Sequence, residues 1–407
     1  MPAVTSAGIG WDYSFRMANH FGRRRWGWVA AGVAVAVAGA GGLLASRLIS
    51  SSAAAAGGKS QPAVAAKAPL ASTSTTSAPP APFTVSLESP APSAKNVDGT
   101  APLVISTGSA TVDTAASVPS ISPVVEGQWS STPGRLVFTP TDAFAPATSY
   151  TVEVKAGLSS ASGRVLDQGE SWSWTTADGS TLRLQQILAQ LGYLPLRWTP
   201  SSATATSLPN RDAYQPPAGQ FAWTWANPPA TLSAQWAPGG YTAMTKGAVM
   251  AFEADHGLAT DGFAGHDVWS ALLAASTATT PATNAHGYTY ALAAKTSPET
   301  LTVWHDGAVI STTPANTGIP VAPTADGTFP VYERLATQVM KGTNPDGSHY
   351  ADPVAWVAYF NGGDAIHYIA RGQYGFPQSL GCVEIPYAVG AQIWPYLTMG
   401  SLVTVVG

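Results

Sequence analysis

Hydrophobic and polar residues alternate along two long stretches of the chain, a pattern typical of half-buried β-strands. In residues 83–177 it recurs in FTVSLES, PLVIST, GRLVFTPT, SYTVEVKAG and SWSWTTA, which are divided by turn residues. About seven strands in such a stretch predict a β-sandwich. Residues 283–407 repeat the pattern in YTYALAAK, LTVWHDGAVIST, WVAYFNGG, AIHYIA and LVTVVG. We therefore expect a mainly β protein with several domains.

Apolar residues recur at helical spacing between these two stretches. TLRLQQILAQLGYLP predicts one helix that stops at Gly192, and KGAVMAFEADHGLATDGFAGHDVWSALLAA predicts two more. Residues 178–276 are thus expected to form a small three-helix module with an insert at about 195–241. Tryptophans in the insert either fill a core, which is the commoner case, or stack on sugar rings. They are Trp198, Trp223, Trp225 and Trp236.

Residues 26–45 form an uncharged, apolar run directly after three arginines. Twenty such residues rise about 30 Å as a helix, enough to cross a bilayer. The arginines predict that residues 1–25 are a cytoplasmic tail and that everything after the run is extracytoplasmic. A retained membrane anchor is the preferred interpretation, and a cleaved signal peptide is the alternative. Residues 46–82 contain almost no large apolar side chains and are expected to be a disordered linker.

Charge, composition and motifs limit the partners, domain types and cofactors that this chain can have. A net charge of −4 with 19 Lys plus Arg residues leaves no basic surface for nucleic acid. Gly (40) and Pro (33) are frequent, which fits loop-rich β-modules joined by linkers. The chain has no HExxH motif, no paired CxxC motif and no clustered His/Asp pattern, so neither a metal nor another cofactor is expected.

Cys382 is the only cysteine in the 407 residues. Exported proteins usually pair their cysteines, so a lone thiol is either buried and inert or kept for its reactivity. His367 precedes it by a strand and a loop, and an imidazole can take the thiol proton to create the thiolate that acyl transfer needs. Gly381 lets a carbonyl approach closely, and the N–H groups of Gly381 and Cys382 are the expected oxyanion hole. Ser379 is expected to hold this loop by hydrogen bonds.

Four segments resemble the L,D-transpeptidase catalytic domain, and they occur in that family's order. They are LTVWHDGAVISTTPANTG, APTADGTFPVY, DAIHYI and SLGCV, of which the last two are the specific part. The resemblance implies Cys382 as nucleophile and His367 as general base, then acid. It also implies a reaction on peptidoglycan stem peptides, in which a Cys382 thioester is passed to a neighbouring amine to form a 3→3 cross-link. Carbapenem-type β-lactams would then be covalent inhibitors.

Two alternatives remain open for residues 283–407. One is an L,D-carboxypeptidase, in which water replaces the acceptor amine. The other is a non-catalytic wall-binding protein, because the chain departs from the family's pattern. Leu380 stands where a histidine is common, Tyr368 where a small residue is usual, and Glu384 where Arg or Asn is common. A carboxylate at position 384 would raise the pKa of a nearby thiol, and His349 is a reserve candidate for the base.

Substrate contacts are predicted from residues near the histidine strand. Arg371 is the nearest fixed cation and is expected either to hold a substrate carboxylate bidentately or to be a solvated surface residue. Tyr350 and Tyr359 either line the donor cleft or belong to the core.

Two further resemblances concern the preceding domains. FAPATSYTVEVKAGLSSASGRVLDQGESWSWTTA resembles bacterial Ig-like modules, which are most often spacers. The helical segments resemble the two halves of the three-helix peptidoglycan-binding module, through LGYLP and the AFE…HGL…DG…G…W…L pattern. This second resemblance implies that cell-wall glycan is a partner.

Overall fold

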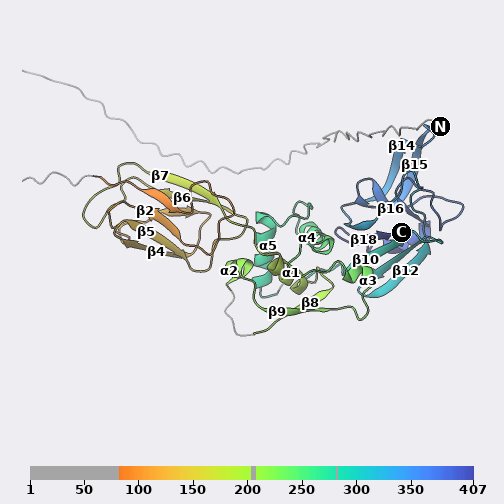
Figure 1. The fold of residues 1–407 in the computed structure, drawn as a ribbon, viewed down its shortest axis with the longest axis horizontal. Helices are drawn as coiled ribbons and strands as arrows, with labels where there is room; N and C mark the ends of the chain where they lie inside the picture. Colours follow the sequence, from red (N-terminus) through yellow and green to blue (C-terminus); the bar gives the residue numbers. More distant parts are fainter. Residues whose placement is uncertain (1–81, 203–207, 281–282) are drawn as a thin grey trace, which may run out of the picture. The chain divides into compact units, whose positions relative to one another are not determined.

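The computed structural model describes residues 82–202, 208–280 and 283–407 (Figure 1). The predicted cytoplasmic tail (1–25), the apolar run (26–45) and nearly all of the linker (46–82) lie outside the described residues. No helix in the described part of the chain is long and apolar enough to span a bilayer. All described residues belong to one unit, Thr75–Gly407.

The first described domain is a two-sheet β-sandwich of seven strands, as the alternating pattern predicts (Figure 1, orange to yellow). One sheet has the order β1-β2-β5-β4 and the other β3-β6-β7. Its core contains a cluster of aromatic rings, in which Tyr150 stacks on Trp174 with 5.7 Å between ring centroids. The strands are β1 (Ser86–Ser89), β2 (Leu103–Ser106), β3 (Ser120–Ser122), β4 (Gly127–Thr132), β5 (Arg135–Pro140), β6 (Ser149–Val154) and β7 (Glu170–Thr175).

Three helices follow, at the positions that the helical spacing predicts: α1 (Thr181–Gln190), α4 (Ala243–Asp255) and α5 (His266–Thr277). The insert between α1 and α4 contains a two-stranded antiparallel sheet and two short helices. These elements are β8 (Leu196–Pro200), α2 (Pro209–Tyr214), β9 (Gly219–Trp223) and α3 (Ala230–Ser233). Trp198 and Trp225 are buried in the core, and Trp223 and Trp236 pack against it. The insert therefore uses its tryptophans mainly for packing.

The C-terminal domain consists of two sheets. The first has the order β12-β11-β10-β18-β13 and the second β14-β15-β16-β17. The first comprises β10 (Thr289–Ala294), β11 (Thr300–His305), β12 (Ala308–Pro314), β13 (Gly327–Pro330) and β18 (Leu402–Val406). The second comprises β14 (Glu333–Thr343), β15 (His349–Asn361), β16 (Asp364–Tyr368) and β17 (Val383–Ile385), and α6 (Tyr387–Ile393) follows it.

The helical module and the C-terminal domain share one hydrophobic core. Tyr290 of β10 and Leu402 of β18 belong to the same buried cluster as the helices. Gly400 approaches Gly247 of α4 so closely that a Cβ at residue 400 would lie 2.0 Å from the Gly247 carbonyl oxygen. These two domains are therefore packed as a single body.

A β-bulge in β15 lies beside the strand that carries the candidate histidine. The pairing of β15 with β16 shifts register between Ala355 and Ala358, and Trp356 in the bulge has a φ of 59°, which is rare for a bulky residue. Its ring packs near Tyr387 and Trp394. The bulge thus anchors β15 against α6.

Glu253 of α4 is a buried carboxylate that should make the helical module sensitive to pH. It is fully buried, Gly262 N–H donates to its Oε2 at 2.9 Å, and its Oε1 has no partner among the described residues. Burial raises its pKa from 4.5 to about 7. Because the folded-state pKa is raised, the stabilisation is complete below about 4.5 and is lost as the pH rises through 7.

We expect Glu253→Gln to remove this loss, because glutamine stays neutral at every pH. Its melting temperature should exceed that of the wild type at pH 8 by roughly 4 °C or more, with little difference at pH 4.5. Thermal unfolding at the two pH values measures this. Asp267→Asn, which neutralises an exposed carboxylate of α5, is the control and should show no such difference. Equal melting temperatures of Glu253→Gln and wild type at pH 8 would contradict the prediction.

Candidate active site

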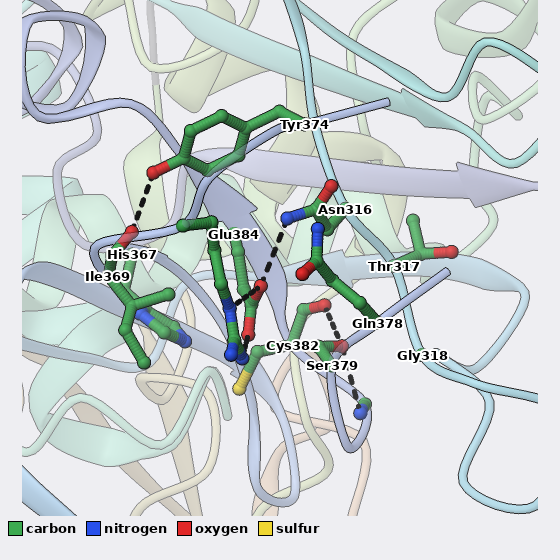
Figure 2. A network of polar contacts seen from close by, with 12 residues as sticks. Asn316, Thr317, Gly318, His367, Ile369, Tyr374, Gln378, Ser379, Cys382 and Glu384 are labelled. Carbon is green, nitrogen blue, oxygen red and sulfur yellow. Dashed lines mark hydrogen bonds and ion pairs between the residues drawn. The ribbon is translucent and has the colours of Figure 1, made fainter. Parts of the chain in front are cut away.

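His367 and Cys382 lie on the same face of the second sheet of the C-terminal domain. β16 pairs with β17 in parallel, with His367 opposite Glu384 and Ile366 opposite Val383. Side chains two positions apart along a strand share a face, so Cys382 and Glu384 project to the same side as His367. Figure 2 shows the imidazole, the thiol and the Glu384 carboxylate together. The pairing register thus brings together the two residues to which the sequence assigns the chemistry.

The Cys382 thiol is partly buried in apolar surroundings. It packs against Val354, Val357, Ala365 and Ile369, and it donates a weak hydrogen bond to the Gly363 carbonyl oxygen at 3.7 Å. Burial, with smaller contributions from the neighbouring carboxylates of Asp364 and Glu384, raises the pKa of the thiol to about 12. The predicted direction of the Glu384 effect is confirmed. At neutral pH the resting cysteine is therefore a thiol.

His367 is 2% exposed, and burial lowers the pKa of its imidazole. Its Nδ1 lies 3.1 Å from the Tyr368 carbonyl oxygen. Because a carbonyl only accepts, Nδ1 carries the proton and Nε2 is left as the basic nitrogen. His367 is consequently neutral at pH 7 and able to accept a proton.

Ser379 and Gly381 shape the loop that presents the cysteine. Ser379 Oγ donates to the Cys382 carbonyl oxygen at 2.6 Å and accepts the Gly381 N–H at 3.2 Å. Gly381 has a φ of +118°, and a Cβ there would lie 2.5 Å from Asp364 Oδ1. Only glycine fits this position. The Gly381 N–H, predicted to face an oxyanion, is engaged by Ser379 in this structure.

Arg371 is bound to Glu384, and this ion pair differs from the predicted role in substrate binding. Arg371 Nε and Nη2 donate to the two carboxylate oxygens at 2.8 and 2.5 Å. Asn316 Nδ2 adds a third donor to Glu384 at 3.1 Å. Glu384 is 3% exposed, so its charge requires these partners. The guanidinium fork that was expected to meet a substrate carboxylate is occupied by a carboxylate of the protein.

A bracket at Asn316–Thr317, which the sequence pattern did not reveal, holds the cysteine loop. The Thr317 carbonyl oxygen accepts the N–H groups of Gln378 and Ser379, each at 3.0 Å. Thr317 itself donates from its N–H and Oγ1 to the buried Glu299 carboxylate at 2.7 and 2.8 Å. The only sequence signal for these residues was their place in the PANTG segment that ends a predicted strand pair.

The remaining predicted residues lie on β15 or at its start. Tyr359 packs against the same apolar cluster as Cys382, and its hydroxyl donates to Gln338 Oε1 at 2.8 Å. Tyr350 is partly buried, and burial and the nearby Cys382 raise the pKa of its phenol. His349, the first residue of β15, is exposed. Its Nδ1 lies 3.1 Å from Oγ1 of Thr343, the paired residue at the end of β14. No group of three or more His, Cys, Asp or Glu side chains that could hold a metal occurs within the described residues.

Two protein families match parts of this chain. Residues 289–405 match the L,D-transpeptidase catalytic domain, and residues 79–176 match the bacterial Ig-like domain. The first match includes the whole of the site described above. The C-terminal domain is therefore an L,D-transpeptidase catalytic domain, and the N-terminal sandwich is a bacterial Ig-like domain.

Solved structures of L,D-transpeptidases are similar to this chain. One is an L,D-transpeptidase from Mycobacterium smegmatis, with 13% identity, 80% of this chain and 100% of that chain covered, and a TM-score of 0.28. L,D-transpeptidase 3 from Mycobacterium tuberculosis is 11% identical, with 80% and 99% covered and a TM-score of 0.28. The catalytic domain of the E. faecium enzyme, acylated by ertapenem, is 28% identical, with 30% and 98% covered and a TM-score of 0.27. No curated protein matches the chain.

The left-handed backbone at Gly381 gives a test of the loop geometry. We expect Gly381→Ala to lower the free energy of unfolding by about 1–3 kcal/mol and to slow alkylation of Cys382 more than tenfold, because the new Cβ displaces the loop from Asp364. Thermal unfolding and mass-spectrometric labelling measure the two effects. Gly363→Ala is the matched control, since a Cβ there meets nothing within 4 Å. If Gly381→Ala and Gly363→Ala had the same unfolding free energy and the same Cys382 alkylation rate, the close approach of Gly381 to Asp364 would not determine the loop geometry.

Proposed function

We propose that this chain is a cysteine-dependent L,D-transpeptidase that forms 3→3 cross-links between peptidoglycan stem peptides. The observation that carries the proposal is the shared face of β16 and β17, where a neutral, buried His367 accompanies the thiol of Cys382. The match of residues 289–405 to the L,D-transpeptidase catalytic domain supports the same reaction class.

In the first half of the reaction, Cys382 Sγ attacks the carbonyl between the L-centre at position three of a tetrapeptide stem and its terminal D-alanine. His367 Nε2 takes the thiol proton as the S–C bond forms. The Cys382 N–H is the donor that we assign to the oxyanion, because Ser379 Oγ engages the Gly381 N–H. The C–N bond then breaks, His367 returns the proton to the leaving amine, and D-alanine departs.

In the second half, the side-chain amine of a neighbouring stem attacks the thioester. His367 removes a proton from this amine and returns it to the Cys382 sulfur as the S–C bond breaks. One amide bond has replaced another, so no nucleotide or other energy source is required. Tyr359 beside the thiol forms one wall of the donor cleft in this proposal.

The other domains place the catalytic domain at its substrate. We propose that the helical module binds cell-wall glycan and that the Ig-like domain acts as a spacer. Residues 26–45 would either hold the chain at the membrane or export it as a cleaved signal, and both routes make the catalytic domain extracytoplasmic.

The reaction is tested by incubating the full chain with a tetrapeptide-stem muropeptide and analysing the products by mass spectrometry. We expect a cross-linked dimer and free D-alanine. Cys382→Ala should abolish both products, because no other thiol is present. His367→Gln should lower the rate by about 100-fold or more, since it removes the general base.

His349→Gln is the matched control, because this exposed histidine is the reserve base and its loss should leave the rate unchanged. A tripeptide without dimer would show an L,D-carboxypeptidase instead. Unaltered muropeptide would contradict catalysis on this substrate and favour a wall-binding protein.

Carbapenem acylation gives an independent test of the nucleophile. The Cys382 sulfur would open the β-lactam ring with no leaving group, so the protein mass should rise by the full mass of the drug. Intact-protein mass spectrometry with ertapenem or imipenem should show this adduct in the wild type and none in Cys382→Ala. An adduct of equal yield in Cys382→Ala would place the acylation on another residue.

A further inference from the structure

Glu384 is a buried carboxylate within the active site whose charge no catalytic step uses. It is 3% exposed and stands directly opposite His367, two positions after Cys382 and on the same face. A carboxylate beside the nucleophile opposes ionisation of the thiol. The site nevertheless contains it, and neighbouring donors compensate its charge.

The compensation comes from the loop between β16 and the cysteine. Arg371 binds both carboxylate oxygens of Glu384 in the planar, bidentate geometry that suits a guanidinium. Asn316 accompanies this pair: its Nδ2 donates to Glu384, and its Oδ1 accepts the Gly375 N–H at 3.0 Å. The same loop is thus tied to β17 through Arg371 and to the Asn316–Thr317 bracket through Gly375. Figure 2 shows the hydrogen bond between Asn316 and Glu384.

The other groups around the site add negative charge or none. The carboxylates of Asp364 in β16 and Glu384 in β17 both oppose ionisation of the Cys382 thiol, and Asp352 of β15 acts electrostatically on His367. Phenols that interact with Cys382 come from Tyr332, Tyr350 and Tyr359. Within the described residues, Arg371 supplies the positive charge among these groups. Without it, the thiol would face two uncompensated carboxylates.

We propose that Arg371 is a positioning residue that acts through Glu384: it cancels the Glu384 charge beside Cys382, so that the thiol can ionise when it attacks. Arg371 is therefore not a substrate-binding residue, although it stands in the active-site loop. The assignment rests on the proposed function, since it takes Cys382 as the nucleophile. Its test, however, measures the thiol itself and needs no peptide substrate.

The experiment is the rate of Cys382 alkylation by iodoacetamide in the full chain between pH 6 and 9.5. Because the chain has one cysteine, every alkylated molecule reports on this site. Arg371→Gln should lower the rate at a given pH about tenfold, the change that one unit of thiol pKa produces. Glu384→Gln should raise the rate by a similar factor. The double variant Arg371→Gln/Glu384→Gln should lie close to the wild type, because it removes both charges.

This order separates charge cancellation from a general loosening of the loop. If the ion pair only maintained the shape of the loop, the alkylation rate of Cys382 would change in the same direction in both single variants. The rate of the double variant would then not return to the wild-type value. Either result would overturn the proposal. If Arg371→Gln fails to fold, the raised rate of Glu384→Gln and the recovery in the double variant still decide the question.

Arg135→Gln is the matched control, since Arg135 forms an exposed ion pair with Glu88 in the Ig-like domain. Its alkylation rate should equal that of the wild type. Failure of the proposed function would appear differently: muropeptide would remain unaltered while the order of alkylation rates held. Failure of this inference would leave the muropeptide dimer formed and the predicted order absent.

Discussion

The parallel pairing of β16 with β17 is the constraint on which the active site depends. It brings the histidine strand and the cysteine turn together although a long loop separates them in the chain. A shift of this pairing by one residue would turn Cys382 away from His367 and would expose Val383, which is fully buried in the core. The apolar side chains on the opposite face, among them Ile366 and Ile385, therefore determine where His367 and Cys382 point. Packing on one face of the sheet defines the chemistry on the other.

Two buried carboxylates hold the loop whose end presents the thiol. Glu299 binds Thr317, and Glu384 binds Asn316 and Arg371, so each carboxylate organises donors from segments that are distant in sequence. Burying a carboxylate without hydrogen-bond partners costs free energy. The loop therefore favours the one conformation that supplies donors to both carboxylates. Ser379 Oγ then holds the cysteine in place by donating a hydrogen bond to the Cys382 carbonyl oxygen. The position of Cys382 is thus determined by residues outside the Cys382–His367 pair.

Much of this architecture was predictable from the sequence, and the part that was not has a common physical cause. Alternation predicted the strands, and the lone Cys382 with an upstream His367 predicted a pair that the structure places on one face of a sheet, because these signals are local or rest on rare residue types. The partner of Arg371 was not predictable in the same way, since a bidentate cation fits a substrate carboxylate and a protein carboxylate equally well. Spacing along the chain contains no information on register, and register decides that Glu384 faces the loop.

The uncharged resting state of Cys382 and His367 protects the thiol from oxidation. Burial is the main factor that keeps Cys382 protonated, with a smaller contribution from Asp364, and the imidazole of His367 is uncharged as well. Thiolates, not thiols, are the species that oxidants attack readily, so a protonated cysteine is protected in an oxidising, extracytoplasmic setting. The same protonation slows acylation unless proton transfer to His367 accompanies the attack. In the proposed reaction, such a site gives up part of its intrinsic nucleophilicity for persistence. It would recover the reactivity through His367, whose position the sheet fixes, when a stem peptide is bound.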